Sequence, residues 1–209
     1  MNVTKTDFFV YPTVYRINEI FYSLQGEGYH TGTPAVFVRF SGCNLACRFC
    51  DTDHRSGTLM TARQIAQTVL QYPEAALIVL TGGEPTLTAD EALVQTIKSL
   101  APLPIAIETN GTRPIPEGID WVTFSPKDAF EGGGAQPCVL TTCDELKVVY
   151  CGQDLARYDH IKALHRFLQP CYAPDPEVCK RNVQACVQAV LHHRGWRLSL
   201  QTHRLLNIP

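Results

Sequence analysis

The sequence predicts an α/β protein whose parallel sheet forms an open, partial barrel of about six strand–helix units. Two observations predict it: short apolar, β-branched runs alternate with helical patterns, and the chemically reactive residues follow the strands. Strands that alternate with helices form right-handed βαβ units, and six units are too few to close an eight-stranded barrel. The chain has 209 residues, 45% of them hydrophobic, which suits a single domain over residues 1–209.

Seven short runs predict the strands, because β-branched and apolar residues favour an extended, half-buried backbone. The runs are Val36–Phe40, Leu77–Leu80, Ile105–Ile107, Val122–Phe124, Leu146–Tyr150, Arg166–Leu168 and Leu198–Leu200. Residues 1–34 precede the first run, and we expect this N-terminal segment to be an extension that caps the barrel.

Apolar residues at helical spacing predict four helices between these strands. The helices expected are one that Thr61 caps, one that begins at Thr88 or Asp90, one over Leu155–Leu164 and one over Glu177–His192. In the last helix the residues expected to face inward are Val183, Val187, Val190 and Leu191.

Charge and hydropathy exclude several classes of partner. Lysine and arginine number 18 against 20 aspartate and glutamate, which argues against a nucleic-acid or anionic membrane partner. The longest apolar run, Ala75–Leu80, is too short to span a membrane, and the first residues lack the apolar core of a signal peptide. We therefore expect a cytoplasmic protein. Nine cysteines are unexpected there, because a reducing compartment disfavours disulfides, so some should bind metal or do chemistry.

The chemically unusual residues come directly after the predicted strands. They are Cys43, Cys47 and Cys50, then Thr81–Pro85, Glu108–Gly111, Ser125–Lys127, Gln169–Pro170 and Gln201–His203. In a parallel barrel the carboxyl ends of the strands meet on one face, where such folds place their sites. Turn geometry would explain the glycines and prolines, but not three cysteines or Glu84 and Glu108.

Cys43-Asn-Leu-Ala-Cys47-Arg-Phe-Cys50 is a C-x3-C-x2-C motif. Structural zinc prefers four ligands, whereas three clustered thiolates suit a [4Fe–4S] cluster that leaves one iron open. An open iron can chelate S-adenosylmethionine, and the reduced cluster can cleave it to a 5′-deoxyadenosyl radical. A zinc loop or buried free thiols is the alternative.

The triplet resembles that of the radical S-adenosylmethionine superfamily, and Thr81-Gly-Gly-Glu-Pro85 resembles its glycine-rich motif. The resemblance implies that the backbone at Gly83 approaches the cofactor, since glycine has no side chain. An ordinary strand-to-helix turn would also explain the two glycines. Phe49 either packs on the adenine or is a core aromatic residue.

Four further segments narrow the resemblance to the 7-carboxy-7-deazaguanine synthase family. They are Leu24–Gly28, Phe37–Gly42, Cys50–Thr52 and Gln201–Pro209, and together with Glu108–Thr112 and Ser125–Lys127 they cover the chain from about residue 16 onward. The family is a carbon–nitrogen lyase of queuosine-precursor biosynthesis that converts 6-carboxy-5,6,7,8-tetrahydropterin to 7-carboxy-7-deazaguanine with loss of ammonia. The resemblance also implies a flavodoxin- or ferredoxin-type electron donor and a homodimer.

The resemblance assigns the site residues. The substrate-binding residues implied are Leu24, Gln25, Gly26, Glu27, Arg39, Thr81, His203 and Pro209, the last through its α-carboxylate. Those implied for S-adenosylmethionine are Phe49, Gly83, Glu84, Ser125, Pro126, Lys127, Gln169, Pro170, Cys171 and Tyr172. Thr52 is implied as a Mg²⁺ ligand, although a threonine after such a loop is more often a capping residue, and one hydroxyl binds Mg²⁺ only with help from substrate and water.

Arg39 lies in an apolar run and should not be buried without a partner. Its guanidinium offers a two-pronged donor for the substrate carboxylate, and a structural pair with Asp51 or Glu27 is the alternative.

Two other functions compete with the synthase. A glycyl-radical-enzyme activase would share the triplet but lack the Gln25–Gly28 and Gln201–Pro209 segments. A non-enzymatic zinc or redox module would have no need of Gly83, Glu84 and Lys127 at strand ends.

The remaining cysteines are Cys138, Cys143, Cys151, Cys171, Cys179 and Cys186. Their spacing is too irregular for a second cluster, and we expect them to serve as small buried hydrophobic residues. Four histidines are expected on the surface or at helix ends: His160, His165, His192 and His193.

Overall fold

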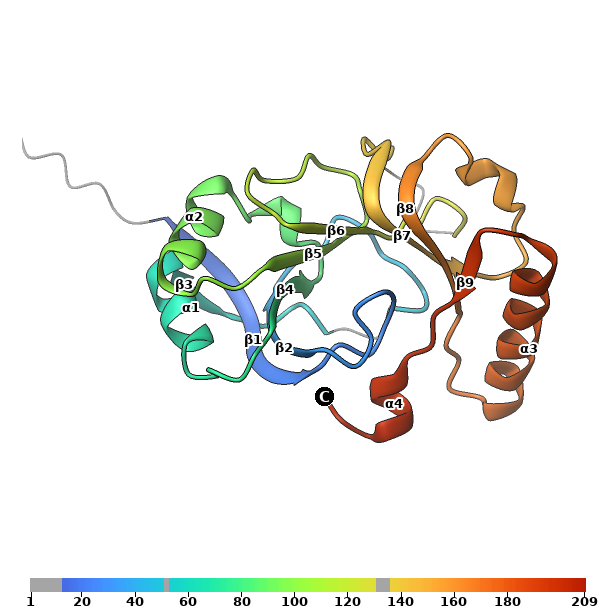
Figure 1. The fold of residues 1–209 in the computed structure, drawn as a ribbon, viewed down its shortest axis with the longest axis horizontal. Coiled ribbons are helices and arrows are strands. Elements are labelled where there is room, and N and C mark those ends of the chain that lie inside the picture. Colours follow the sequence, from blue (N-terminus) through green and yellow to red (C-terminus); the bar gives the residue numbers. More distant parts are fainter. Residues whose placement is uncertain (1–12, 51–52, 131–135) are drawn as a thin grey trace, which may run out of the picture.

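The computed structural model describes residues 13–50, 53–130 and 136–209. Their strands form one nine-stranded sheet in the order β3-β1-β2-β4-β5-β6-β7-β8-β9, which curves around a central space without closing (Figure 1). The strands are β1 (Val14–Leu24), β2 (Pro34–Phe40), β3 (Thr58–Thr61), β4 (Leu77–Gly82), β5 (Ile105–Thr109), β6 (Trp121–Phe124), β7 (Thr142–Tyr150), β8 (Lys162–Pro170) and β9 (Trp196–Leu198). The predicted open, partial α/β barrel is confirmed.

From β2 to β9 the neighbouring strands are parallel, with β1 and β3 added antiparallel at one edge. All seven predicted strands are present, although the last, expected over Leu198–Leu200, is found at Trp196–Leu198. The sequence interpretation missed β1 and β3. Part of the predicted 1–34 extension is therefore strand β1, which pairs with β2.

Three helices cover the outer surface of the sheet: α1 (Ala62–Val69), α2 (Glu91–Leu100) and α3 (Pro176–His192). The short α4 (Thr202–Leu206) lies instead at the open side of the barrel (Figure 1). Thr61 caps α1 as predicted, since its hydroxyl accepts from Gln64 N while the Gln64 side chain accepts from Thr61 N. Of the two starts expected for α2, Asp90 is the cap; its carboxylate accepts from Leu93 N at 2.9 Å.

The helix predicted over Leu155–Leu164 is wrong. A short 3₁₀ helix spans Leu155–Tyr158, and strand β8 begins at Lys162. Leu155, Tyr158 and Ile161 are buried at a spacing of three residues, and this spacing suits a 3₁₀ turn as well as a helix.

The inward face predicted for α3 needs a correction at Leu191, which is 71% exposed. The buried residues of α3 are Cys186 and Ala189, because small side chains let the helix pack closely on β8 and β9. His165 also differs from expectation: it lies on β8 and stacks on Tyr29 with ring centroids 4.4 Å apart. His192 and His193 lie at the end of α3, as predicted.

Side chains alternate between the two faces of the sheet. Val38 and Leu80 are among the residues that point outward and pack in the core under α1 and α2. On the inner face, a packed lower layer is formed by Phe37, Val79 and Ala106. Two residues further along the same strands, the inner face carries Arg39, Thr81 and Glu108. The inside of the barrel thus changes from apolar to polar toward the carboxyl ends of the strands.

In the described part of the chain, no helix is both long enough and apolar enough to cross a membrane.

Candidate active site

A cavity of about 790 Å³ opens at the carboxyl ends of the parallel strands. All eight residues predicted to bind substrate line it, and so do eight of the ten predicted to bind S-adenosylmethionine. The two that do not are Pro126 and Cys171. Thr52 and its neighbour Asp51 lie outside the described residues.

The three cysteines of the C-x3-C-x2-C motif line one wall of this cavity, and no other cysteine among the described residues lines it. Burial raises the pKa of the Cys43 and Cys47 thiols, and the Lys127 ammonium opposes this shift at Cys47. The Leu45 N–H donates to Cys43 Sγ at 3.5 Å. In the described residues the three thiols do not converge as a compact set of metal ligands. As a donor set on one loop, three thiolates fit a [4Fe–4S] cluster that leaves one iron open.

The glycine-rich turn after β4 packs against the start of the cysteine loop. A Cβ atom on Gly83 would lie 1.9 Å from Gly42 O and 3.2 Å from Cys43 N. Glu84 N donates to the same Gly42 oxygen at 2.9 Å. Only glycine allows this approach, so residue 83 helps to fix the first cysteine of the triplet.

The Glu84 side chain is 1% exposed, although the residue borders the cavity. One carboxylate oxygen accepts from Thr86 N at 3.0 Å and from Thr109 Oγ1 at 2.8 Å, and the other accepts from Asn110 N at 2.7 Å. These bonds join the ends of β4 and β5, so the carboxylate is a structural part of the wall.

Two asparagines connect the cysteine loop to the end of β5, and the sequence interpretation missed this link. Asn110 Nδ2 donates to Asn44 Oδ1 at 3.0 Å, and Asn44 Nδ2 donates to Thr112 Oγ1 at 2.8 Å. Asn44 stands inside the triplet and Asn110 inside the Glu108–Thr112 motif, so their proximity depends on the sheet order alone.

The segment after β1 crosses the mouth of the barrel. Gly28 has a left-handed φ of +67°, and a Cβ there would lie 1.9 Å from Glu145 Oε1. Its N–H donates to Ser199 Oγ at 2.9 Å, and Tyr29 N donates to Glu145 Oε2 at 3.0 Å. Glycine is required here by both the backbone conformation and the close contact.

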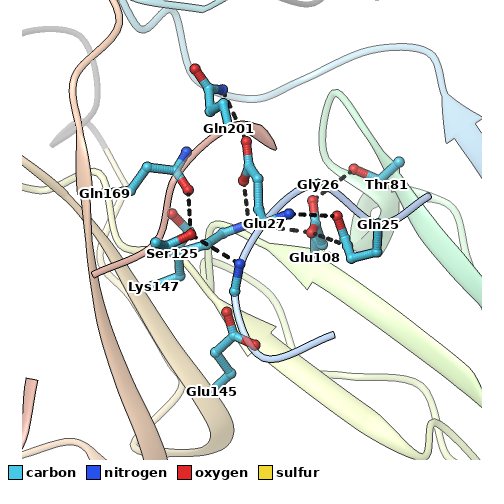
Figure 2. A network of polar contacts seen from close by, with 12 residues as sticks. Gln25, Gly26, Glu27, Thr81, Glu108, Ser125, Glu145, Lys147, Gln169 and Gln201 are labelled. Atoms are coloured by element: carbon cyan, nitrogen blue, oxygen red, sulfur yellow. Dashed lines mark hydrogen bonds and ion pairs between the residues drawn. The ribbon is translucent and has the colours of Figure 1, made fainter. Parts of the chain in front are cut away.

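Gln25 and Glu27 point from this segment into a polar network (Figure 2). Gln25 Nε2 donates to Glu108 Oε1 at 3.1 Å, and Gln201 Nε2 donates to Glu27 Oε1 at 2.9 Å. Thr81 Oγ1 donates to Glu108 Oε2 at 3.2 Å. Residues from β4, β5, the segment after β1 and the segment after β9 therefore meet at one place.

Lys147 on β7 lies at the centre of this network, and the sequence interpretation did not single it out. Its ammonium is 2.5 Å from Glu27 Oε2 and 3.2 Å from Glu108 Oε1. A lysine between Leu146 and Val148, both fully buried, was the available signal, since a cation in an apolar run requires a partner.

The charges in the cavity shift one another's pKa values. Burial alone would raise the pKa of Glu27, but Lys147, Gln201 and His203 outweigh it and lower this pKa to about 2. Burial works to lower the pKa of Lys147, yet its carboxylate neighbours raise that pKa above the ordinary value. Glu27 and Lys147 are therefore both charged at neutral pH.

Arg39 lines the cavity and is paired with Glu19 rather than with Glu27, one of the two partners that the sequence suggested; the other, Asp51, lies outside the described residues. Its Nε lies 2.8 Å from Glu19 Oε1 on the neighbouring strand β1, and its guanidinium lies 5.3 Å from the centre of the Phe21 ring. Glu27 binds Lys147 instead. The ring and the partner hold the guanidinium in place at the cavity wall.

Ser125 and Lys127 follow β6, and the Lys127 ammonium donates to Ser125 O at 2.8 Å. Burial lowers the pKa of Lys127. Further along the sheet, Gln169 Oε1 on β8 accepts from Ser199 Oγ at 3.0 Å, and the Tyr172 ring lies under the Arg204 guanidinium at 3.9 Å. These residues form the wall opposite β2.

Cys171 turns away from the cavity and toward Cys151, whose thiol forms a hydrogen bond with it and lowers the Cys171 pKa to about 7. Cys186 is fully buried, as predicted for the remaining cysteines. Cys151 is exposed, so that expectation is wrong for it, because it lies in the turn beyond the end of β7.

Residues 201–209 form the last wall. Gly26 packs so closely on His203 that a Cβ would lie 2.3 Å from His203 Nδ1, and Gly26 O accepts from Thr202 N at 2.9 Å. Pro209 O accepts from Ser23 Oγ at 2.8 Å. The segment thus packs against the end of β1 and the turn that follows it.

Comparison with known proteins decides the family. The radical SAM superfamily matches residues 37–131. The 7-carboxy-7-deazaguanine synthase of Bacteroides thetaiotaomicron is 54% identical over 193 residues, which cover 92% of this chain and 98% of that protein. This chain belongs to the 7-carboxy-7-deazaguanine synthase family. The synthase of Bordetella pertussis is 40% identical over 218 residues, covering 93% of this chain and 99% of that one.

The crystal structure of QueE from Escherichia coli has the same fold, with a TM-score of 0.70 and 27% identity over 90% of this chain and 93% of that one. The chain is therefore a radical SAM enzyme of the 7-carboxy-7-deazaguanine synthase family, with a [4Fe–4S] cluster and S-adenosylmethionine as cofactors. Its family favours the synthase over the activase and over the zinc or redox module.

Proposed function

We propose that this enzyme converts 6-carboxy-5,6,7,8-tetrahydropterin to 7-carboxy-7-deazaguanine with loss of ammonia. The observation that carries the proposal is the composition of one cavity, which brings the cysteine triplet together with Arg39 and the Glu27–Lys147–Glu108 network. A cation faces the cavity on one side and two carboxylates face it on the other. This polarity matches a flat substrate with a carboxylate and several N–H donors.

Cys43, Cys47 and Cys50 would hold the cluster, and Gly83 would let the backbone approach S-adenosylmethionine. When bound, the cluster and S-adenosylmethionine would supply the radical chemistry for hydrogen-atom abstraction. The chain itself binds and orients both molecules and keeps the reactive centre away from bulk water. Further cofactor contacts are proposed for Phe49, Glu84, Ser125, Pro126, Lys127, Gln169, Pro170, Cys171 and Tyr172, with Pro126 and Cys171 acting through their backbone.

For the substrate, we assign the carboxylate to Arg39, because its guanidinium is held at the cavity wall by Glu19 and Phe21. The N–H groups of the ring system go to Glu27, Gln25 and the backbone of the segment after β1. Leu24, Gly26, Thr81 and His203 complete the substrate-binding set. Each of these residues lines the cavity.

The decisive experiment is anaerobic turnover with a chemical reductant, S-adenosylmethionine and the carboxytetrahydropterin, followed by mass spectrometry. The expected product has lost ammonia and carries the carboxylate on a five-membered ring. Unchanged pterin in the presence of intact cluster and cleaved S-adenosylmethionine would contradict the proposed substrate.

Mg²⁺ is proposed as a third cofactor, bound by Thr52 together with substrate oxygens and water. A bound divalent ion can orient substrate oxygens and stabilise charge as the ring rearranges. In the same turnover assay, Mg²⁺ should raise the rate, and T52A should reduce that dependence. An equal rate after thorough chelation and after addition of Mg²⁺ would overturn the assignment.

We propose that the α-carboxylate of Pro209 also binds the substrate. Pro209 lines the cavity and is held by Ser23, and its two oxygens can accept from ring N–H and amino groups. A chain extended by a few residues beyond Pro209 should keep its cluster and its affinity for S-adenosylmethionine, yet bind the pterin at least about tenfold more weakly. A chain extended at the N-terminus serves as the control. Equal pterin affinity in both would show that the carboxylate has no such role.

The electron donor is proposed to be a flavodoxin or ferredoxin, and the working form a homodimer. No disulfide joins any of the nine cysteines, all of which lie in the described residues; this suits a reducing compartment, so we propose that the enzyme works in the cytoplasm.

A further inference from the structure

Lys147 is more deeply buried than the two carboxylates that it contacts. Its side chain is 6% exposed, against 15% for Glu27 and 25% for Glu108. All three residues line the cavity, but the two carboxylates are more accessible from it than the lysine is; Figure 2 shows them converging on Lys147 from different elements. An ammonium in this place is better suited to orient the carboxylates than to touch a substrate.

The two carboxylates retain the capacity to accept further hydrogen bonds. Glu27 accepts from Lys147 and Gln201, and Glu108 accepts from Lys147, Gln25 and Thr81. An ionised carboxylate offers about four lone-pair sites, so the five bonds leave room for donors from a ligand. Protonation of either carboxylate would turn one of these acceptor sites into a donor.

Ionisation of both groups depends on the cation that they both contact. The elements that carry Glu27 and Glu108 bring two negative charges to one ammonium, and without it one carboxylate would take up a proton to avoid the repulsion. A protonated carboxyl group donates where the ionised one accepted. The remaining charged and titratable groups that act on this pair are Glu145 on β7, Lys127 after β6 and His203 on α4.

We propose that Lys147 is a positioning residue that holds Glu27 and Glu108 ionised and side by side, so that both accept hydrogen bonds from the N–H edge of the pterin. The proposal rests on the proposed function for its ligand. It assigns to Lys147 no contact with the substrate and no part in the radical chemistry. Its consequence is that substrate affinity, and not the affinity for S-adenosylmethionine, depends on this lysine.

The test compares the wild type, K147M and K147R by equilibrium binding of the carboxytetrahydropterin under anaerobic conditions between pH 6 and pH 9. K147M should bind the pterin about 30-fold more weakly at pH 6, because one acceptor is lost. The ratio of its dissociation constant to that of the wild type should fall as the pH rises and the shared proton leaves. His203 is present in both proteins, so its contribution largely cancels in this ratio.

K147R restores the charge but not the geometry. It should bind the pterin more weakly than the wild type, and the ratio of the two dissociation constants should stay constant with pH because both carboxylates remain ionised. A pH-dependent ratio for K147R like that of K147M would overturn the proposal. All variants should keep the wild-type affinity for S-adenosylmethionine, and a loss there equal to the loss for the pterin would show a general structural role instead.

K98M is the matched control. Lys98 pairs with Asp120 at 2.7 Å on the outside of the sheet, so its removal should leave both affinities unchanged.

If K147M does not fold, the charge-balanced variant K147M/E108Q replaces it. This variant should bind the pterin more weakly than the wild type, and the ratio of the two dissociation constants should not vary with pH. An affinity equal to that of the wild type would overturn the proposal.

Infrared difference spectra separate this proposal from the proposed function, because they need no ligand. K147M should show a protonated carboxyl band at pH 6 that the wild type lacks and that K147M/E108Q has lost. If the wild type fails to bind the pterin, the proposed function is wrong whatever the spectra show. If the wild type binds it and K147M binds it equally well at pH 6, only the role of Lys147 is wrong.

Discussion

Replacing Cys43, Cys47 or Cys50 by alanine will abolish cluster assembly and turnover together. Each thiolate holds one iron of a cluster that has three protein ligands, and the described residues that line the cavity include no fourth cysteine to replace a lost one. Anaerobically reconstituted wild type should carry about four irons per chain, and each variant should carry close to none. Iron and sulfide analysis with the visible absorption spectrum measures this directly.

The control uses cysteines outside the cavity. C138A, C179A and C186A should keep the wild-type iron content, although C186A should lose about 1 kcal/mol of stability because Cys186 is fully buried on the inner face of α3. Loss of about half the iron in any of these three variants would indicate a second cluster and contradict the assignment of a single one.

The second large effect is expected for Gly83→Ala. The added Cβ would lie 1.9 Å from a backbone oxygen, that of Gly42, and backbone cannot swing aside as a side chain can. Relieving the contact means moving Gly42, which breaks its hydrogen bond from Glu84 N and displaces Cys43. We expect a loss of about 3 kcal/mol or more in the free energy of unfolding, together with weaker cluster retention.

Thermal unfolding monitored by circular dichroism and iron analysis of the same samples measure both effects. Gly152→Ala is the control, because a Cβ there meets nothing within 4 Å and only the left-handed φ of +90° is strained. It should cost about 1 kcal/mol and leave the iron content unchanged. If Gly83→Ala behaves like Gly152→Ala, the turn after β4 does not fix the cysteine loop.

Residues close together in sequence were the predictable part of this site. The triplet, the Gly82–Gly83 turn and the polar residues at strand ends were recognised because the strand that precedes each of them has a clear apolar pattern. Strand β1 was missed because its residues alternate between buried and exposed and include charged side chains, as suits an antiparallel strand near the edge of a sheet.

What could not be predicted were the pairings between distant elements. Lys147 meets Glu27 across 120 residues and Glu108 across 39, and Arg39 pairs with Glu19 only because β1 lies antiparallel to β2. Such contacts follow from strand order and register, which no local pattern specifies. The helix expected at Leu155–Leu164 failed for another reason, since three buried residues at a spacing of three do not separate a 3₁₀ turn from a helix.

The packing of residues 199–209 against the end of β1 and the turn after it affects the order in which the chain folds. Gly28 bonds to Ser199, Gly26 to Thr202 and Ser23 to Pro209, contacts that span 171, 176 and 186 residues. Contacts this distant in sequence form late, because the chain between them must be ordered first. During synthesis, the segment after β1 therefore cannot form these contacts until residues 199–209 have been made. Competence to retain the pterin should appear abruptly at the end of folding, after the sheet and the cysteine loop are in place.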